Sequence, residues 1–276
     1  MRKLNVPTIL LNLGVAIGGL VTALPFFWMV ASSFKTTEEI FNPASIVPKS
    51  FDLGSYTRLF SVWPFWNWYL NSALAALITT VAVLFVCSLA GFGFAKYRFR
   101  GRNPLFFILL GSSMIPFPIL LIPLFIVVSR IGWTNSLAAL TVPFIAPAVG
   151  IFLMRQYILS LPQELLDAAR IDGSSEFRIY AQIVLPIVRP GLATLAIITF
   201  ISSWNSFLWP LVVLRNDTAM TLPVGLATML GGVQAGSAPP YGPAMAASTL
   251  VSIPAIVLFL LVQRQYIAGL TSGAVK

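Results

Sequence analysis

The chain has 276 residues, of which 58% are hydrophobic and only 9% charged, and its formal net charge is +9. Soluble domains carry roughly a quarter charged residues, so this composition excludes soluble enzymes and predicts a membrane protein with several spans. Histidine is absent, which excludes imidazole catalysis and histidine-ligated zinc. The single cysteine, Cys87, can form neither a disulfide within the chain nor a thiolate metal cluster.

Six uncharged apolar stretches follow in chain order, and each is long enough to cross a hydrocarbon core of about 30 Å as a helix. They comprise residues 9–34, 70–95, 104–129, 133–154, 191–213 and 243–263. The expected fold class is therefore all-α, a polytopic membrane protein with six transmembrane helices in one domain, residues 1–276. The first stretch is longer than the apolar region of a cleavable signal peptide, so we expect it to remain as an anchor.

Basic residues between the stretches predict the orientation of the chain. With the amino terminus in the cytoplasm, twelve of the seventeen Lys and Arg residues lie inside and five outside, while the eight acidic residues divide evenly. The net charge is then +8 inside and +1 outside, which is the positive-inside pattern. Both termini are expected to be cytoplasmic, and the basic excess indicates orientation rather than a nucleic-acid partner.

Two outside loops, one cytoplasmic segment and a cytoplasmic tail are expected. The outside loops are residues 35–69 and 214–242, the cytoplasmic segment is 155–190, and the tail is 264–276. Aromatic residues in the first outside loop favour a membrane-interface belt; they are Trp63, Phe65, Trp66, Trp68 and Tyr69. The second outside loop either projects toward an extracytoplasmic binding protein or is a flexible loop in solvent.

The cytoplasmic segment predicts two short amphipathic helices joined by a glycine bend. Ser160 and Gln163 form a candidate capping box with Pro162 in the first turn. Gly173 can end that helix in the left-handed conformation, and Ser174 or Ser175 can cap the next one. The second helix carries an apolar stripe before Pro186 stops it; the stripe is Phe177, Tyr180, Ala181 and Val184. By itself this pattern fits a partner-docking hairpin or a hairpin lying on lipid headgroups.

The order of residues in this segment resembles the EAA loop of permease subunits of binding-protein-dependent ABC importers. The matching residues are Asp167, Ala168, Ala169, Asp172, Gly173, Ile183, Val184, Leu185 and Pro186. Asp167 stands where the family usually has glutamate, which keeps the charge and shortens the reach by one methylene. The chain is most similar to the sugar-transporting, MalG-like branch, through Asn71 and Ser72, residues 90–102, residues 204–210 and the ending 263–276.

The resemblance implies a type I importer permease with the MetI-like fold in a bacterial or archaeal cytoplasmic membrane. It implies one half of the translocation pathway for a sugar or sugar-like solute. The expected partners are a second, MalF-like permease subunit, two ATPase subunits, an extracytoplasmic solute-binding protein and membrane lipid. The sequence has no GxxxxGK[ST] loop, so we expect no catalytic, metal or cofactor site in this chain, with ATP and Mg acting on the ATPase subunits.

The resemblance assigns two groups of site residues, and the chemistry of the side chains suggests a third. The 160–186 helix pair is the implied ATPase-coupling element, through Glu164, Asp167, Ala168, Ala169, Asp172, Gly173, Leu185 and Pro186. Thr271, Ser272 and Gly273 lie in the tail, which in relatives reaches toward the ATPase subunits. Polar and aromatic side chains in the fifth stretch suit a neutral, hydroxyl-rich ligand, or else pack membrane helices together; they are Trp204, Asn205, Ser206, Phe207 and Trp209.

Two other classes of protein are alternatives to the importer. An ion-coupled secondary transporter needs ionisable residues inside its spans, and the six stretches contain none, although backbone carbonyls could still bind sodium. An intramembrane enzyme lacks histidine, and its carboxylates lie outside the stretches. The importer subunit is therefore the favoured interpretation, with the secondary transporter as the alternative.

Overall fold

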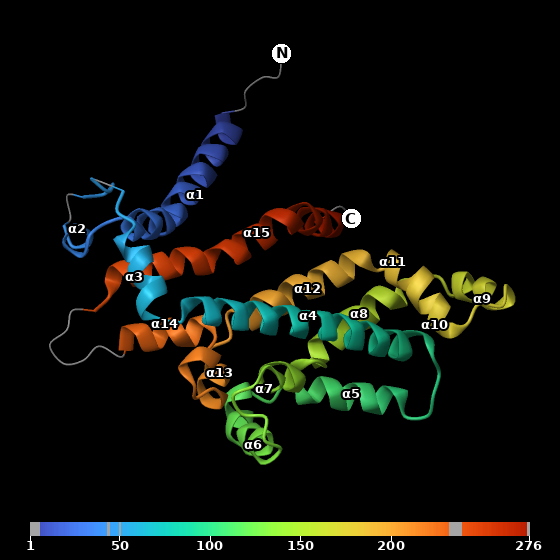
Figure 1. The fold of residues 1–276 in the computed structure, drawn as a ribbon. Coiled ribbons are helices and arrows are strands. Elements are labelled where there is room, and N and C mark those ends of the chain that lie inside the picture. The colour runs from blue at the N-terminus through green and yellow to red at the C-terminus, as the bar shows by residue number, and fades with distance from the viewer. Residues whose placement is uncertain (1–5, 43–44, 50, 232–238, 275–276) are drawn as a thin grey trace. The chain divides into compact units, whose positions relative to one another are not determined.

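The computed structural model describes residues 6–42, 45–49, 51–231 and 239–274, and it describes side chains from residue 11 to residue 260 within those ranges (Figure 1). All regular structure in the described ranges is helical. The helices are α1 (Val6–Ser33), α2 (Thr37–Ile40), α3 (Gly54–Val62), α4 (Phe65–Lys96), α5 (Arg102–Ser112), α6 (Phe117–Arg130), α7 (Leu137–Thr141), η1 (Val142–Phe144), α8 (Ala148–Leu159), α9 (Gln163–Ile171), α10 (Glu176–Ile179), η2 (Tyr180–Val184), α11 (Leu185–Ile187), α12 (Arg189–Trp204), α13 (Leu208–Val213), η3 (Asp217–Ala219), α14 (Leu222–Gly231) and α15 (Tyr241–Ala274). The all-α prediction is confirmed.

Three helices are long and apolar enough to cross a membrane unbroken, and they lie in α1, α4 and α15. In three further pairs, the two helices are long and apolar enough to cross a membrane only when they are counted together. Each of these pairs is bent by more than 40°. The pairs are α5 with α6 at 98°, α7 and η1 with α8 at 48°, and the α10–α11 segment with α12 at 79°. With each pair taken as one span, the described residues hold the six spans that the composition predicts, although half of them are not straight.

Prolines account for the breaks. Pro116 lies directly before α6, Pro147 lies directly before α8, and Pro190 is in the first turn of α12. A proline has no N–H to continue the hydrogen-bond ladder and its ring crowds the preceding turn, so a helix restarts there in a new direction. Each proline is tolerated because the first amides of a helix have no intrahelical acceptor.

Contacts divide the chain into two compact units, residues 1–66 with 225–253 and residues 67–224 with 254–276. In the first unit, the 18-residue apolar window of α1 has no buried residue, so this helix presents its surface to lipid or to another subunit. Just beyond α1, Lys35 is 1% exposed, and its Nζ donates to the carbonyl oxygens of Ser45 at 2.5 Å and Ile46 at 3.1 Å. These bonds fix the backbone at Ser45 and Ile46 against the end of α1.

Part of the predicted aromatic belt is wrong. Phe65 and Trp68 are each only 2% exposed, so they pack inside the chain and do not face the membrane interface. The ring of Phe65 packs edge-on against Phe60, with centroids 5.6 Å apart, and Trp68 Nε1 donates to the carbonyl oxygen of Asp217 at 2.6 Å. Trp66, at 60% exposed, keeps the outward position that a belt requires.

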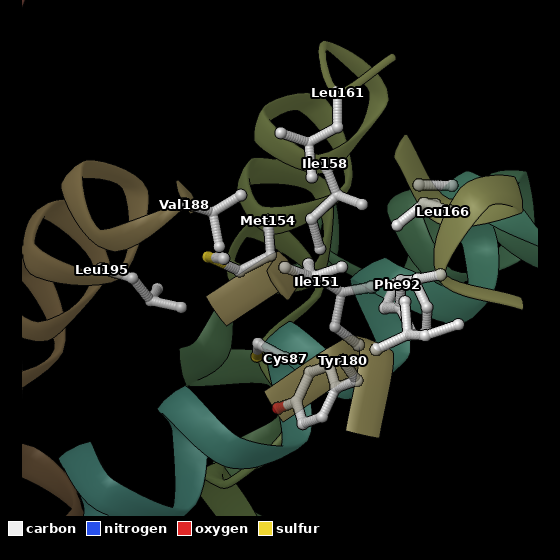
Figure 2. Packing of buried hydrophobic residues seen from close by; sticks show 14 of the residues in the cluster. Cys87, Phe92, Ile151, Met154, Ile158, Leu161, Leu166, Tyr180, Val188 and Leu195 are labelled. Carbon is white, nitrogen blue, oxygen red and sulfur yellow. The ribbon is translucent and has the colours of Figure 1, made fainter. Parts of the chain in front are cut away.

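The second unit is built around one apolar cluster at the crossing of α4, α8 and α12, with the hairpin α9–α10 at its end (Figures 1 and 2). Figure 2 labels members of this cluster: Cys87, Phe92, Ile151, Met154, Ile158, Leu161, Leu166, Tyr180, Val188 and Leu195. A smaller cluster joins α4, α6, α7 and α13 around Trp209, whose Nε1 donates to the carbonyl oxygen of Ala139 at 2.8 Å. Buried side chains of the 155–190 segment thus belong to the same core as the spans.

Two glycines let α4 and α8 approach closely. A Cβ atom at Gly91 would lie 2.8 Å from Met154 Cβ and 2.9 Å from the backbone nitrogen of Arg155. At Gly150 a Cβ atom would lie 2.9 Å from Cys87 Sγ. Small residues at such crossings give membrane helices their van der Waals contact.

We therefore predict that Gly91→Ala destabilises the protein by about 1–3 kcal/mol, because the added methyl meets backbone atoms that cannot move aside. The matched control is Gly93→Ala on the same helix, where a Cβ would meet nothing within 4 Å and alanine improves helix propensity. Thermal unfolding of the purified chain in detergent measures both. Equal midpoints for the two variants would contradict the tight crossing.

Candidate functional site

The first helix of the hairpin does not begin as the capping-box prediction expects. Ser160 has helical backbone angles and its hydroxyl donates to the carbonyl oxygen of Tyr157 at 2.7 Å, so it ends α8. Pro162 takes the N-cap position of α9 with no side-chain cap. The predicted box between Ser160 and Gln163 is wrong because an N-cap residue must have extended backbone angles, and the preceding helix already uses this serine.

The bend that follows is as predicted. Gly173 has φ +79°, its N–H donates to the carbonyl oxygen of Arg170, and the N–H of Ser174 donates to that of Ala169, both at 3.0 Å. This pair of bonds is a Schellman motif, which requires the left-handed conformation at the glycine. Ser175 then caps α10 by accepting the N–H of Arg178.

The apolar stripe of the second helix is only partly correct. Tyr180 and Val184 are buried and Ala181 is half-buried, whereas Phe177 is 65% exposed. Residues 180–184 form a π-helical turn, η2, so buried positions recur every four residues and Phe177 falls off that line. The wider turn precedes Pro186, which has no N–H to donate, and the helix continues one residue past it to Ile187.

An ion-pair network that the sequence analysis missed ties the two helices together. Arg170 Nη1 lies 2.7 Å from Asp167 Oδ1, and Arg170 Nε lies 2.7 Å from Glu176 Oε1. Arg170 Nη2 also donates to Glu176 Oε2 at 3.2 Å, which makes that pair bidentate. Tyr97, just beyond α4, donates its hydroxyl to Glu176 Oε2. The only sequence signal was the i,i+3 spacing of Asp167 and Arg170, since Glu176 and Tyr97 meet through the fold.

The network fixes the protonation states of its members at neutral pH. The hydrogen bond from Arg170, and then the one from Tyr97, lowers the pKa of Glu176, which stays a carboxylate. Burial, and then the hydrogen bond to Glu176, raises the pKa of Tyr97 to about 12, so its hydroxyl stays a donor. The Glu176 carboxylate raises the pKa of Arg170 still further above neutrality.

Two more contacts hold the hairpin against the end of α4. Lys96 Nζ donates to the carbonyl oxygen of Leu161 at 2.6 Å. The hydroxyls of Ser88 and Tyr180 lie 2.7 Å apart, and both residues are at most 2% exposed. Leu166 and Ile179, both fully buried, add one apolar anchor from each hairpin helix. The hairpin is therefore a rigid extension of the span core.

The predicted coupling residues divide between the free face and the core side of this hairpin. Those exposed are Glu164, Asp167, Ala168, Asp172, Gly173 and Pro186. Ala169 is 8% exposed and packs against the chain's own core, and Leu185 is half-buried, so neither side chain is open to a partner. Ile171, at 86% exposed, and Phe177 add apolar surface to the free face. Glu164 through Gly173 thus form the surface that another subunit can reach.

The residues proposed for the solute path also divide. Trp204 and Trp209 are each 2% exposed, and Trp204 packs against the rings of Tyr69 and Phe200. Asn205 and Phe207 are exposed and Ser206 is half-buried, because the helix is interrupted between α12 and α13 at these three residues. The open part of the predicted path is therefore residues 205–207.

The predicted tail site lies beyond the described side chains. Backbone helix α15 continues to Ala274, whereas the side chains of Thr271, Ser272 and Gly273 lie outside the described residues.

Three long apolar helices, three bent pairs and an exposed hairpin packed on the same core are the arrangement expected of a membrane permease subunit. The chain belongs to the family described as binding-protein-dependent transport system inner membrane component, whose model matches residues 87–271. It is thus a permease subunit of an ABC importer and not itself the ATPase.

Relatives match over nearly the whole chain. The arabinooligosaccharides transport system permease protein AraQ of Halalkalibacterium halodurans is 38% identical, over 97% of this chain and 96% of AraQ. The trehalose/maltose transport system permease protein MalG of Thermococcus litoralis is 32% identical, over 100% of this chain and 99% of MalG. A chain from a bacterial ABC transporter involved in the import of the acidic polysaccharide alginate has a TM-score of 0.84 at 25% identity, over 96% of this chain and 98% of that chain.

We predict that Glu176→Gln loosens the hairpin, because it removes the charge that Arg170 pairs with and weakens the acceptor of Tyr97. Amide hydrogen exchange over residues 174–180 should become about fivefold faster, the scale of an exposed ion pair. Asp172→Asn is the matched control, since that carboxylate is exposed in the same bend and forms no salt bridge among the described residues. Unchanged exchange in Glu176→Gln would contradict the role of the network.

Proposed function

We propose that this subunit imports a neutral oligosaccharide as one half of a permease pair, driven by two separate ATPase subunits that bind ATP and Mg. The observation that carries this proposal is the hairpin: it is exposed on the 164–173 face, locked internally by Arg170, and continuous through Tyr180 and Val184 with the span core. A rigid lever of this kind converts the movement of a docked subunit into movement of the spans.

The orientation follows from the charge pattern and the hairpin together. Both termini and the 155–190 segment lie in the cytoplasm, where the ATP is, and the 35–69 and 214–242 loops lie outside. The outer loops are the surfaces that a solute-binding protein would reach. A bacterial or archaeal cytoplasmic membrane is the setting that this arrangement fits.

A neutral saccharide fits the open part of the path better than an acidic one. Asn205 and Ser206 offer amide and hydroxyl groups beside the aromatic face of Phe207, a combination that suits hydroxyl-rich ligands. No Lys or Arg lies within the six apolar stretches, so an anion would find no counter-charge there. The names of AraQ and MalG, which refer to oligosaccharides and disaccharides, support the same class.

The coupling role predicts a specific effect of substitution at Gly173. Gly173→Val should reduce copurification of the ATPase subunits and solute uptake, because a β-branched residue at φ +79° costs roughly 1–2 kcal/mol and opens the bend. A Cβ there meets nothing within 4 Å, so Gly173→Asn, which tolerates this conformation, is the matched control and should keep both activities. Normal copurification and uptake in Gly173→Val would contradict the docking role.

The solute class is tested on the complex purified from its native membrane through a tag on this chain. Two ATPase subunits and a second permease should accompany it. With the native binding protein added, arabinotriose, maltose or trehalose should raise ATP hydrolysis more than an alginate oligosaccharide does. A chain that purifies alone, or an ATPase that responds to the acidic saccharide only, would overturn the proposal.

A further inference from the structure

The first turns of α4 carry three polar side chains that form hydrogen bonds with a distant segment of the chain. Trp68, Asn71 and Ser72 stand at i, i+3 and i+4 and therefore share one helix face. That face meets residues 217–222, the start of the second outside loop. The motif residues Asn71 and Ser72, which the coupling site does not use, thus act about 150 positions away in sequence.

Four hydrogen bonds make this contact, and each involves the backbone of residues 217–222. Trp68 Nε1 donates to the carbonyl oxygen of Asp217 at 2.6 Å. Asn71 Nδ2 donates to those of Thr218 at 2.9 Å and Met220 at 3.0 Å. The N–H of Leu222 donates to Ser72 Oγ at 2.8 Å. Because Trp68 and Ser72 are 2% exposed and Leu222 is 1% exposed, the segment cannot shift without moving α4.

The opposite end of α4 holds the coupling hairpin. Ser88 bonds to Tyr180, Lys96 donates to Leu161, and Tyr97 donates to Glu176. Asn71 and Tyr97 are separated by 26 residues, which is about 39 Å of helix at 1.5 Å per residue. One helix is therefore hydrogen-bonded to residues 217–222 near its start and to the hairpin near its end.

Between these two sets of hydrogen bonds α4 is unbroken, unlike its neighbours. Within residues 67–224, all of which are described, the other spans are bent pairs with angles of 48°, 79° and 98°. A bent pair can absorb a displacement by changing its angle, whereas an unbroken hydrogen-bonded helix passes it on.

We propose that α4 transmits a displacement of residues 217–222, caused by the docking of the binding protein outside, to the coupling hairpin, with Trp68, Asn71 and Ser72 as positioning residues. This inference rests on the proposed function, because it requires a binding protein outside and an ATPase inside.

The test uses the tagged complex in nanodiscs, with the native binding protein and with maltose or arabinotriose as the solute. Asn71→Ala should leave basal ATP hydrolysis and ATPase copurification unchanged and lower the maximal stimulation at saturating binding protein by roughly five- to tenfold, the usual scale of coupling between sites. A local effect on docking would instead raise the half-saturating concentration of binding protein and leave the maximum intact, and that result would overturn the inference.

Matched controls come from the same helices. Asn67→Ala removes the same amide one turn earlier on α4, from an exposed side chain that makes no hydrogen bond within the described structure, and it should keep full stimulation. At the inner end, Tyr97→Phe should lower the maximum, whereas Tyr157→Phe, whose hydroxyl also has no hydrogen-bond partner among the described residues, should keep it.

The double variant Asn71→Ala with Tyr97→Phe decides whether the hydrogen bonds at the two ends of α4 act through one element. If they do, the double variant loses no more stimulation than the worse single variant; if they act separately, the losses multiply, and the inference fails. A wild-type complex without ATPase subunits, or without stimulation by any of the saccharides, would refute the proposed function itself, which is a different result from normal stimulation in Asn71→Ala.

Discussion

The close crossing of α4 and α8 is the contact on which the rest of the second unit depends. Gly91 and Gly150 bring the two backbones together, and lipid supplies no hydrophobic force between helices, so packing at this distance must hold them. The hairpin inherits its rigidity from the crossing, because Leu166, Ile179 and Tyr180 insert into the same cluster. The exposed face of the hairpin is thus the outer side of a core whose inner side is the helix bundle.

The polar contacts at the hairpin are placed where water can support them. Arg170, Asp167 and Glu176 keep 31%, 54% and 46% of their side-chain surface exposed, so none of these three charges is fully buried at a desolvation cost. Nearer the middle of α4, the next polar contact is the hydroxyl pair of Ser88 and Tyr180, which lies among the mainly apolar side chains of the cluster. This gradient from charge to hydroxyl to hydrocarbon follows the polarity of a membrane interface.

The sequence predicted the elements whose cause is local and missed those whose cause is tertiary. The six apolar stretches, the bend at Gly173 and the cap at Ser175 follow from composition and from the conformation of single residues. The bends at Pro116 and Pro147 were open to the same reasoning, but apolar length alone does not show them. The bonds of Glu176 with Tyr97 and of Asn71 with Thr218 join residues that only the fold brings together, and no spacing rule finds them.

The π-helical turn at residues 180–184 has a consequence for how such a subunit varies. A π turn holds about one residue more than an α turn, so it absorbs an added residue that would rotate everything after it by about 100° in a regular α-helix. Loss of a single residue there would restore regular α-helix and leave α12 facing nearly the same neighbours. This stretch can therefore differ in length by one residue between related chains without turning the helix that follows.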